Sequence, residues 1–567
     1  MQATAVQSWG PTYTGSIRWY VRILPSLTDF AFLLPAFLAI LAGTQTLLAD
    51  GDTGWHIRTG EWILEHRAIP KVDLFSFTKT GQPWFAWEWG WDLLFGSIHK
   101  AWGLGAVALA NLVLLCFVSA LLYRLIRRCS GNDLLAMLFT VLAFFGSSIH
   151  WLARPHLLSW VFVLIFYHAI LSAAEGRVRG LYWLPFLTVA WVNIHGSFFV
   201  GVLMVFLTAM AEAASVLCSE RRSCLLAFAN ARPYLLCAGA CIAASFVNPY
   251  TWHLHRHIFD YLRDSRLLDQ IQEFQSISFH HWPTMFFECM LVMGLASTVW
   301  CLKRRNFAAA SLIVLWAHFA LLSARNIPIF LFIAAPWVCC MMQDAGRSLK
   351  PLSCVNHFCS AIEEVFTELQ PVERIARWHV ASLLVVVWMM YLLANGDTRL
   401  NVNFDAKKFP AQTIPVLESR RAGHVFTFDQ WGDYLIYRLY PSTQVFVDGR
   451  SDFYGADFVL DCGHIVNARY DWNAQLSKFS VDAVLLKPDA PLATVLKQSP
   501  KWQVLFDDGH AIVFGARAAV APAISAASQQ NVRFSPVYKN GGNELGAMTG
   551  SQVLNCNLRP ITHERRS

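Results

Sequence analysis

The sequence predicts an α-helical membrane protein with about eleven transmembrane helices and an α/β domain outside the membrane. Of its 567 residues, 55% are hydrophobic and only 15% are charged, whereas charged side chains make up about a quarter of a soluble globular chain. Apolar stretches recur between residues 29 and 395, and strand-like and helical runs alternate after them. The net charge of +7 is small for this length, so composition gives no reason to expect a nucleic-acid partner.

The candidate spans are judged against the roughly 20 apolar residues that cross a hydrocarbon core. Several are shorter than this, so we expect tilted, broken or half-buried helices among them. The candidates lie at residues 29–49, 104–126, 133–150, 156–175, 181–194, 196–217, 233–247, 284–302, 307–323, 327–343 and 378–395.

Basic residues predict the orientation, because Lys and Arg collect in the cytoplasmic loops of membrane proteins. Arg18 and Arg22 precede the first span, and basic residues follow every even-numbered span. The segment 1–28 and those loops are therefore predicted to be cytoplasmic. An odd number of spans then places the residues after 395 on the outer side of what we expect to be a bacterial inner membrane.

Unusual polar residues gather in the predicted outer loops. Ionisable groups at membrane depth are costly and usually functional. For each residue alone, loop solvation or anchoring at the interface is the alternative, but the same asymmetry in five loops weakens that alternative for the set. The candidates are Asp50, Asp52, His56 and Glu88 in the long first loop (50–103), Arg154 and His156 in the second, Asn193 and His195 in the third, and Arg325 in the fifth.

The first outer loop opens with "ADGDTGWH", which places Asp50 and Asp52 directly after the first span. This arrangement resembles the GT-C superfamily of polytopic glycosyltransferases, which includes protein O-mannosyltransferases and aminoarabinose transferases. Their long first external loop also begins with acidic residues and continues into an amphipathic helix. The stretches "ARPHLLSW", "WVNIHGSF" and "RNIPIF" also resemble uncharacterised bacterial membrane proteins placed near that superfamily. The resemblance covers roughly residues 27–395.

The resemblance implies a cell-envelope glycosyltransferase. Such an enzyme takes a sugar from a polyprenyl-phosphate donor in the bilayer and passes it to a glycan, lipid or protein acceptor on the outer side. One alternative is a transporter or flippase for a lipid-linked glycan, which would need charged residues near mid-membrane, where these spans carry few. Another is a non-catalytic envelope assembly protein whose outer domain is the working part.

The first-loop acids suit this transfer chemistry. A carboxylate near the acceptor nucleophile serves as general base, and Asp50, which lies nearest the membrane, is the predicted base. Asp52 would hold the acceptor or a divalent ion, Mg²⁺ or Mn²⁺. His56 lies four residues after Asp52 and would share a helical face with it. The alternative is a helix C-terminal turn with solvated acids.

Positive charge is needed on the departing phosphate. Arg325 is the first candidate and Arg154 the second, because the guanidinium fork matches phosphate oxygens at two points. Snorkelling to the interface is the alternative for both. Glu88 lies within "WFAWEWGW", whose aromatic rings suit sugars and membrane interfaces equally.

Two further patterns predict local structure. Trp55, Thr59, Trp62 and Ile63 form a stripe suited to the headgroup layer. Histidines recur at alternate positions in the fourth outer loop, which is more typical of a strand than of a helical zinc site. No Cys is near them, so we expect no zinc. These histidines are His253, His255 and His257.

Residues 396–517 predict a small α/β domain with a mainly parallel sheet and an antiparallel pair. Charged residues follow the predicted strand ends, where such sheets bind ligands; turn caps and a structural Arg–Asp pair are the alternative. The domain has no Gly-rich phosphate loop, so a nucleotide sugar is not expected there. Residues 518–567 predict a disordered tail. The charged residues are Asp429, Asp433, Asp448, Arg450 and Asp452.

Overall fold

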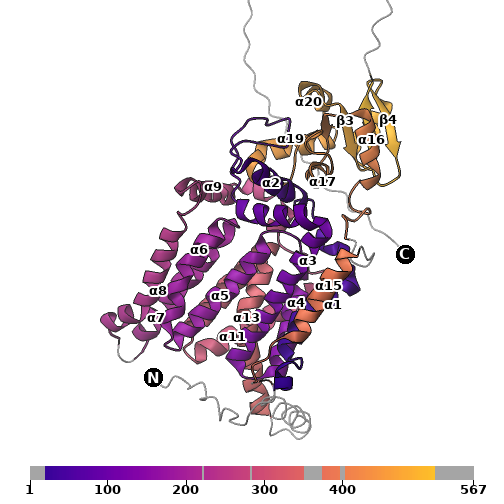
Figure 1. The fold of residues 1–567 in the computed structure, drawn as a ribbon. Coiled ribbons are helices and arrows are strands. Elements are labelled where there is room, and N and C mark those ends of the chain that lie inside the picture. Colours follow the sequence, from indigo (N-terminus) through magenta and orange to yellow (C-terminus); the bar gives the residue numbers. More distant parts are fainter. Residues whose placement is uncertain are drawn as a thin grey trace, which may run out of the picture. The chain divides into compact units, whose positions relative to one another are not determined.

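A computed structural model describes residues 19–219, 222–280, 284–349, 373, 375–395 and 402–517 (Figure 1). Residues 1–18 of the predicted cytoplasmic segment and the whole predicted tail, 518–567, lie outside the described residues. The described residues all belong to one compact unit, Met1–Arg517. Within it, the first outer loop and the C-terminal α/β part share one hydrophobic core, to which Trp55, Trp84 and Trp431 belong.

Apolar helices form the membrane part of the chain. Among the described residues, eight helices are long and apolar enough to span a membrane, and three shorter apolar helices accompany them. Every predicted span coincides with one of these helices, which confirms the polytopic α-helical fold. The long stretches, some of which include a flanking 3-10 turn, contain α1 (Leu27–Ala42), α3 (Trp89–Ser130), α4 (Asp133–Ser147), α5 (His156–Ala174), α7 (Phe199–Leu217), α8 (Cys224–Ala244), α11 (Thr284–Lys303) and α13 (Ile327–Leu349); the shorter ones contain α6 (Leu184–Val192), α12 (Phe307–Leu322) and α15 (Val380–Ala394).

Polar caps start several helices on the predicted cytoplasmic side. Ser26 and Asp29 form a reciprocal capping box at the start of α1. The Asn132 side chain accepts from Leu135 N at the start of α4, and Ser223 accepts from Leu226 N at the start of α8. These caps satisfy backbone N–H groups that the first turn of a helix leaves unpaired. The cap at Ser223 also explains why α8 begins before the predicted span at 233–247.

The first outer loop folds into helix α2 (Thr53–His66) and the first turns of α3. A Cβ on Gly60 would lie 1.8 Å from the Asp92 carbonyl oxygen, so only glycine permits this close approach of α2 to α3. The expected stripe in the headgroup layer is wrong for three of its members, because Trp55, Thr59 and Ile63 are buried by the surrounding protein. An amphipathic pattern alone does not distinguish a lipid face from a protein face.

The histidine-rich loop contains the helix α9 (Trp252–Arg263), so the expected strand is wrong. Residues two apart on a helix point in different directions. Accordingly, His253 stacks on Trp252, His255 contacts Ser245, and His257 contacts Asp452. In the described part of the chain, no group of three or more His, Cys, Asp or Glu side chains is arranged to hold a metal ion.

The α/β part contains a five-stranded sheet of order β2-β1-β3-β5-β4. The first three strands are parallel, and β5 runs antiparallel to both of its neighbours, as the sequence predicts. Helix α17 (Asp429–Leu439) follows β1, and a loop at residues 446–450 follows β2. The strands are β1 (His424–Phe426), β2 (Gln444–Val445), β3 (Ala483–Leu486), β4 (Trp502–Asp507) and β5 (Ile512–Ala516); the other helices of this part are α16 (Ile414–Arg420), α18 (Ser451–Tyr454), α19 (Ala456–Val466), α20 (Trp472–Lys478) and α21 (Pro491–Gln498).

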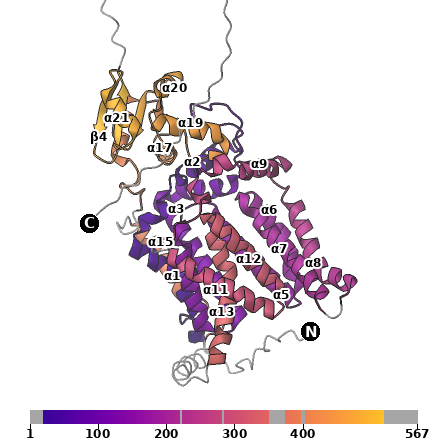
Figure 2. The same cartoon turned by 180° about the vertical axis from the view of Figure 1, so that it is seen from behind.

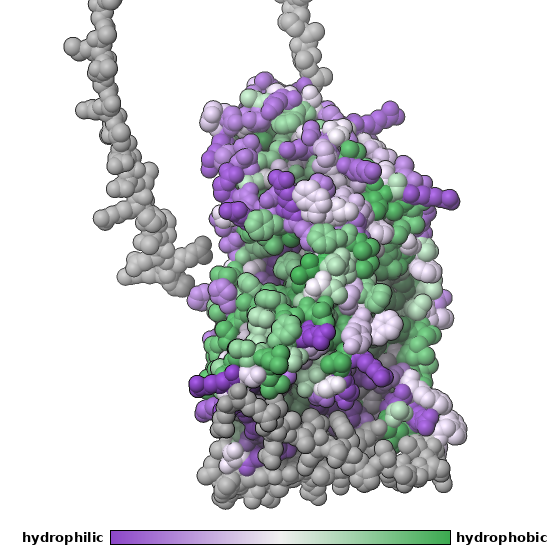
Figure 3. All heavy atoms as spheres, turned by 90° about the vertical axis from the view of Figure 1, so that its left-hand side faces the viewer, coloured by the Kyte–Doolittle hydropathy of each residue, from purple (hydrophilic) through white to green (hydrophobic). Residues whose placement is uncertain are grey.

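Helices α2 and α17 lie side by side at one end of the membrane helices (Figures 1 and 2). A Cβ on Gly51 would lie 2.4 Å from the carbonyl oxygen of Gln430, and one on Gly54 would lie 2.5 Å from that of Asp433. Figure 3 shows apolar side chains over the helical part of the visible face and mostly hydrophilic ones over the α/β part. The two glycines thus allow the α/β domain to pack directly on the first predicted outer loop.

Candidate active site

A cavity of about 1430 Å³ is bounded by the membrane helices, by the predicted outer loops at one end of them, and by the α/β domain. One part of its wall is polar and collects most of the residues that the sequence singled out. Another part is apolar and is built from α5, α7, α12 and α13. The polar residues include Asp50, Asp52, Glu88, Arg154, His195 and Arg325; the apolar ones include Trp160, Val200, Leu203, Trp316, Phe319 and Ile329.

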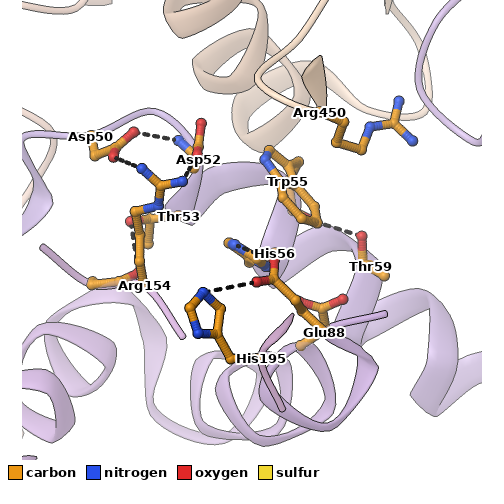
Figure 4. A network of polar contacts seen from close by, with 12 residues as sticks. Asp50, Asp52, Thr53, Trp55, His56, Thr59, Glu88, Arg154, His195 and Arg450 are labelled. Atoms are coloured by element: carbon orange, nitrogen blue, oxygen red, sulfur yellow. Dashed lines mark hydrogen bonds and ion pairs between the residues drawn. The ribbon is translucent and has the colours of Figure 1, made fainter. Parts of the chain in front are cut away.

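Arg154 is the centre of the polar wall (Figure 4). Its Nη1 donates to Asp50 Oδ2 at 3.0 Å, and its Nη2 lies 2.8 Å from Asp52 Oδ2. Nη1 also donates to Glu273, which the sequence analysis did not select. Asp50 and Asp52 are only 6% and 4% exposed, so they are not the solvated acids of an open turn.

Backbone contacts place Arg154 against these acids. Thr53 Oγ1 donates to the Ala153 carbonyl at 3.2 Å, and Ala153 N donates to the Leu47 carbonyl at 3.2 Å. These bonds join the second outer loop to the start of the first. Asp50 Oδ1 accepts from Asp52 N at 3.0 Å, so Asp50 is engaged through both of its oxygens.

The α/β domain closes the site behind Asp52. A Cβ on Gly449 would lie 2.2 Å from Asp52 Oδ1 and 2.8 Å from Asp433 Oδ2, so both carboxylates converge on this glycine. Asp433 is completely buried, and its Oδ1 accepts from Gly449 N at 2.8 Å. Gln430 also approaches, because its Oε1 accepts from Gly51 N and its Nε2 lies 3.4 Å from Asp52 Oδ1.

Burial controls the protonation of this pair. It raises the pKa of Asp52 to about 7, where Arg154 opposes the rise and Asp50 supports it. Burial also raises the pKa of Asp433 well above its ordinary value, and the nearby Asp52 carboxylate adds to the effect. The direction of this shift favours the protonated form of Asp433, whose hydroxyl would donate a hydrogen bond to Asp52.

Glu88 forms a second cluster with two histidines (Figure 4). Its carboxylate oxygens lie 3.8 Å from His56 Nε2 and 3.6 Å from His195 Nε2. His56 Nδ1 lies 2.5 Å from Asp92 Oδ1, so the His56 ring is held by α3 rather than by Asp52. Burial raises the pKa of Glu88 to about 8 and lowers that of His195 to about 3. At neutral pH this cluster is an uncharged hydrogen-bonding surface.

Arg325 is the second arginine of the polar wall. Its Nη2 lies 3.2 Å from Glu273 Oε2, and its guanidinium stacks over the Phe274 ring at 4.2 Å. Glu273 therefore bridges two guanidinium groups. Although burial opposes the effect, Arg154 and Arg325 hold the pKa of Glu273 well below its usual range. Glu273 lies in the fourth predicted outer loop but was not among the predicted site residues, because no single loop reveals that its partners are arginines of two other loops.

The remaining candidates hold the walls in place. Asn193 accepts from Trp89 Nε1 at 2.9 Å and donates to two backbone carbonyls, so it ties the third loop to the start of α3. His156 lines the cavity, and its Nε2 lies 2.8 Å from the His150 carbonyl. His195 Nδ1 contacts the hydroxyls of Ser159 and Ser197.

Arg450 joins the two parts of the chain beside the cavity. Its Nη2 lies 2.6 Å from both Asp73, in the first outer loop, and Asp448. The guanidinium is buried over Trp84, at 4.5 Å from the ring centre. Arg450 and Asp448 therefore fit the alternative of a structural Arg–Asp pair better than that of a ligand site.

In their present arrangement, the carboxylate oxygens around Asp52 do not fit a divalent ion. Asp50, Asp52 and Glu273 would supply oxygen ligands of the kind that Mg²⁺ or Mn²⁺ prefers. All three instead face the guanidinium of Arg154. An ion could bind these oxygens only after that side chain had moved away.

No protein-family model matches the chain, and no curated protein matches it. Solved structures from Archaeoglobus fulgidus do match. Its oligosaccharyltransferase, tethered to an acceptor peptide that contains the NVT sequon, has a TM-score of 0.54 at 12% identity and covers 87% of this chain and 74% of that one. The apo form has a TM-score of 0.52 at 12% identity, with 88% and 75% covered. The archaeal oligosaccharyltransferase AglB, with an inhibitory peptide and a dolichol-phosphate, has a TM-score of 0.52 at 12% identity, with 87% and 74% covered. At this identity the likeness shows a shared fold.

Proposed function

We propose that this chain, which has the GT-C fold of these oligosaccharyltransferases, is a membrane glycosyltransferase. It would move a sugar from a polyprenyl-phosphate donor to an extracytoplasmic acceptor. One observation carries this proposal. A single cavity combines buried first-loop acids, arginines from two other loops and an apolar wall formed by membrane helices. A lipid-linked phosphosugar has the matching parts: a polar sugar, an anionic phosphate and an apolar chain.

Asp52 is the proposed general base. An acceptor hydroxyl or amine attacks the anomeric carbon of the sugar, and its proton passes to Asp52 as the bond to the phosphate oxygen breaks. The bonding electron pair leaves with the polyprenyl phosphate. A base works best when its pKa lies near the operating pH, and that of Asp52 is about 7. Asp50, the base expected from sequence, bonds to Arg154 and to Asp52 N within the same turn, which suits a role in positioning Arg154.

Arg325 is the proposed ligand of the donor phosphate. It contacts one carboxylate at the site, that of Glu273, whereas Arg154 contacts three. More of its N–H groups therefore remain for a bidentate interaction with phosphate oxygens. Glu88, protonated at neutral pH, can donate a hydrogen bond to the sugar or to the departing oxygen.

The apolar wall supports a lipid-linked donor. Its side chains come from helices of the membrane part, and they continue from the polar wall of the same cavity. A prenyl chain placed there would keep its apolar surface away from water, while the phosphate lay at the polar wall. The cavity lining also includes Gln430, Gly449 and Asp452 from the α/β domain, where an acceptor would meet that domain.

Turnover of a donor panel tests the proposal. The full-length protein in lipid nanodiscs would be incubated with polyprenyl-phosphate-linked sugars, and release of polyprenyl phosphate would be measured by mass spectrometry. Arg325→Lys keeps the charge but loses the fork, so we expect KM for the donor to rise by about tenfold or more, as for a lost charge-assisted hydrogen bond.

Arg256→Lys is the matched control, because Arg256 on α9 is 71% exposed and outside the cavity lining. An equal rise in KM in both variants would remove the assignment of Arg325. A protein that neither binds nor consumes any lipid-linked phosphosugar would refute the transferase function.

A further inference from the structure

Three carboxylates from two distant outer loops surround one positive charge. Asp50 and Asp52 come from the first loop and Glu273 from the fourth, and all three contact the guanidinium of Arg154. Three carboxylates around one point is an arrangement that divalent cations commonly use. Here the cation is a side chain of the protein itself.

We propose that Arg154 takes the place of a divalent cation in this site, so that the chain needs no metal ion there. The part of this inference that concerns turnover rests on the proposed transferase function. The part that concerns ion binding does not.

The positions of the partners support a fixed role for Arg154. Its side chain is only 20% exposed, and it follows Ala153, which is hydrogen-bonded to both ends of the first-loop acid segment. Glu273 is held from the other side by Arg325, so it cannot follow a displaced Arg154 without breaking a second ion pair. A metal ion would have to expel a half-buried, triply paired guanidinium and leave it unpaired, which is unfavourable.

Charge balance supports the same conclusion. Asp50, Asp52 and Glu273 bring three negative charges when ionised, and Arg154 and Arg325 bring two positive charges. If Arg154 were removed, three acids would face one another with a single cation nearby. Such a cluster needs a replacement cation or extra protons, because buried like charges repel. Removal of Arg154 should therefore create a divalent-ion site.

Manganese binding tests the proposal on the full-length protein in nanodiscs. Electron paramagnetic resonance reports free Mn²⁺ by a sharp signal that is lost on binding. We expect wild-type protein to leave this signal unchanged and Arg154→Ala to abolish it at equimolar Mn²⁺. Arg154→Lys keeps the positive charge and should behave as wild type. Arg154→Ala combined with Glu273→Gln should lose the gained binding.

Two results on wild-type protein would overturn the proposal without any variant. One is tight binding of Mn²⁺ that Asp52→Asn removes. The other is loss of sugar transfer on treatment with EDTA and its recovery with Mg²⁺ or Mn²⁺. The two proposals can also fail separately. If no donor is consumed, the proposed function fails. The assignment of Arg154 still stands if wild-type protein does not bind Mn²⁺ and Arg154→Ala does.

Discussion

Asp52 and Asp433 point their carboxylates at the same glycine, Gly449, although one belongs to the first outer loop and the other to the α/β domain. Both side chains are buried, and both have a raised pKa. Burial favours the protonated form of Asp433, which can then donate a hydrogen bond to the Asp52 carboxylate. The α/β domain therefore helps to set the protonation of the acid that faces the cavity.

Replacement of Asp433 should change the pH dependence of turnover. A general base is active when deprotonated, so kcat/KM should rise with pH through the pKa of Asp52, about 7. Asp433→Leu removes a donor to the Asp52 carboxylate, which raises the pKa of Asp52 and moves this rise to higher pH. Asp433→Asn keeps a donor and should leave the rise in place. An unshifted profile for a folded Asp433→Leu protein would exclude this role for Asp433.

The two first-loop acids should differ in their effect on catalysis. Asp52→Asn should lower kcat by about 10²- to 10⁴-fold, the usual loss for a general base, and should abolish the rise with pH. Asp50→Asn should have a smaller effect, because Asp50 positions Arg154 and takes no proton in the reaction. Single-turnover kinetics at several pH values would measure both. The opposite ranking would assign the base to Asp50, and full activity in both variants would remove these acids from the reaction.

The two buried ion pairs that Arg450 forms, with Asp73 and with Asp448, should stabilise the junction between the α/β domain and the first outer loop. Arg450→Met leaves two buried carboxylates without their partner, so we expect a loss of about 3–5 kcal/mol in stability. Thermal unfolding and limited proteolysis would detect it. Arg438→Met is the control, because Arg438 is an exposed residue of α17. Equal unfolding temperatures for the two variants would contradict a stabilising role for the pair.

The orientation can be tested with a membrane-impermeant maleimide on intact cells. Cysteine at position 470 should be labelled, because Tyr470 is 99% exposed in the α/β domain. Cysteine at position 305, where it replaces Arg305 of the basic cluster at the end of α11, should react only after permeabilisation. The exposed native cysteines Cys218, Cys224 and Cys289 would first be replaced. The reverse pattern would place the cavity on the cytoplasmic side and separate it from an external acceptor.

The membrane fold followed from the sequence because hydropathy and length are local properties. An apolar stretch of bilayer length predicts a helix whatever its neighbours are, and every predicted span coincides with an apolar helix. The parallel strands and the antiparallel pair of the α/β domain were equally visible as short local patterns. Local patterns misled in two places. The Trp55 stripe is buried by protein rather than by lipid headgroups, because both surroundings favour the same amphipathic periodicity. The histidines His253, His255 and His257 lie on a helix, although their alternate spacing is typical of a strand.

The partners of each charge were decided only by the tertiary structure. The sequence pointed to Asp50, Asp52, Arg154 and Arg325, because acids and arginines in outer loops are unusual. It could not reveal that Arg154 neutralises the acids, that Glu273 bridges both arginines, or that Asp433 reaches Asp52. These pairs join different loops and domains of the chain, and their contacts depend on how the helices pack and on the glycines that let backbones approach closely. Protonation depends in turn on that packing, because burial contributes most to the raised pKa values of Asp52 and Glu88.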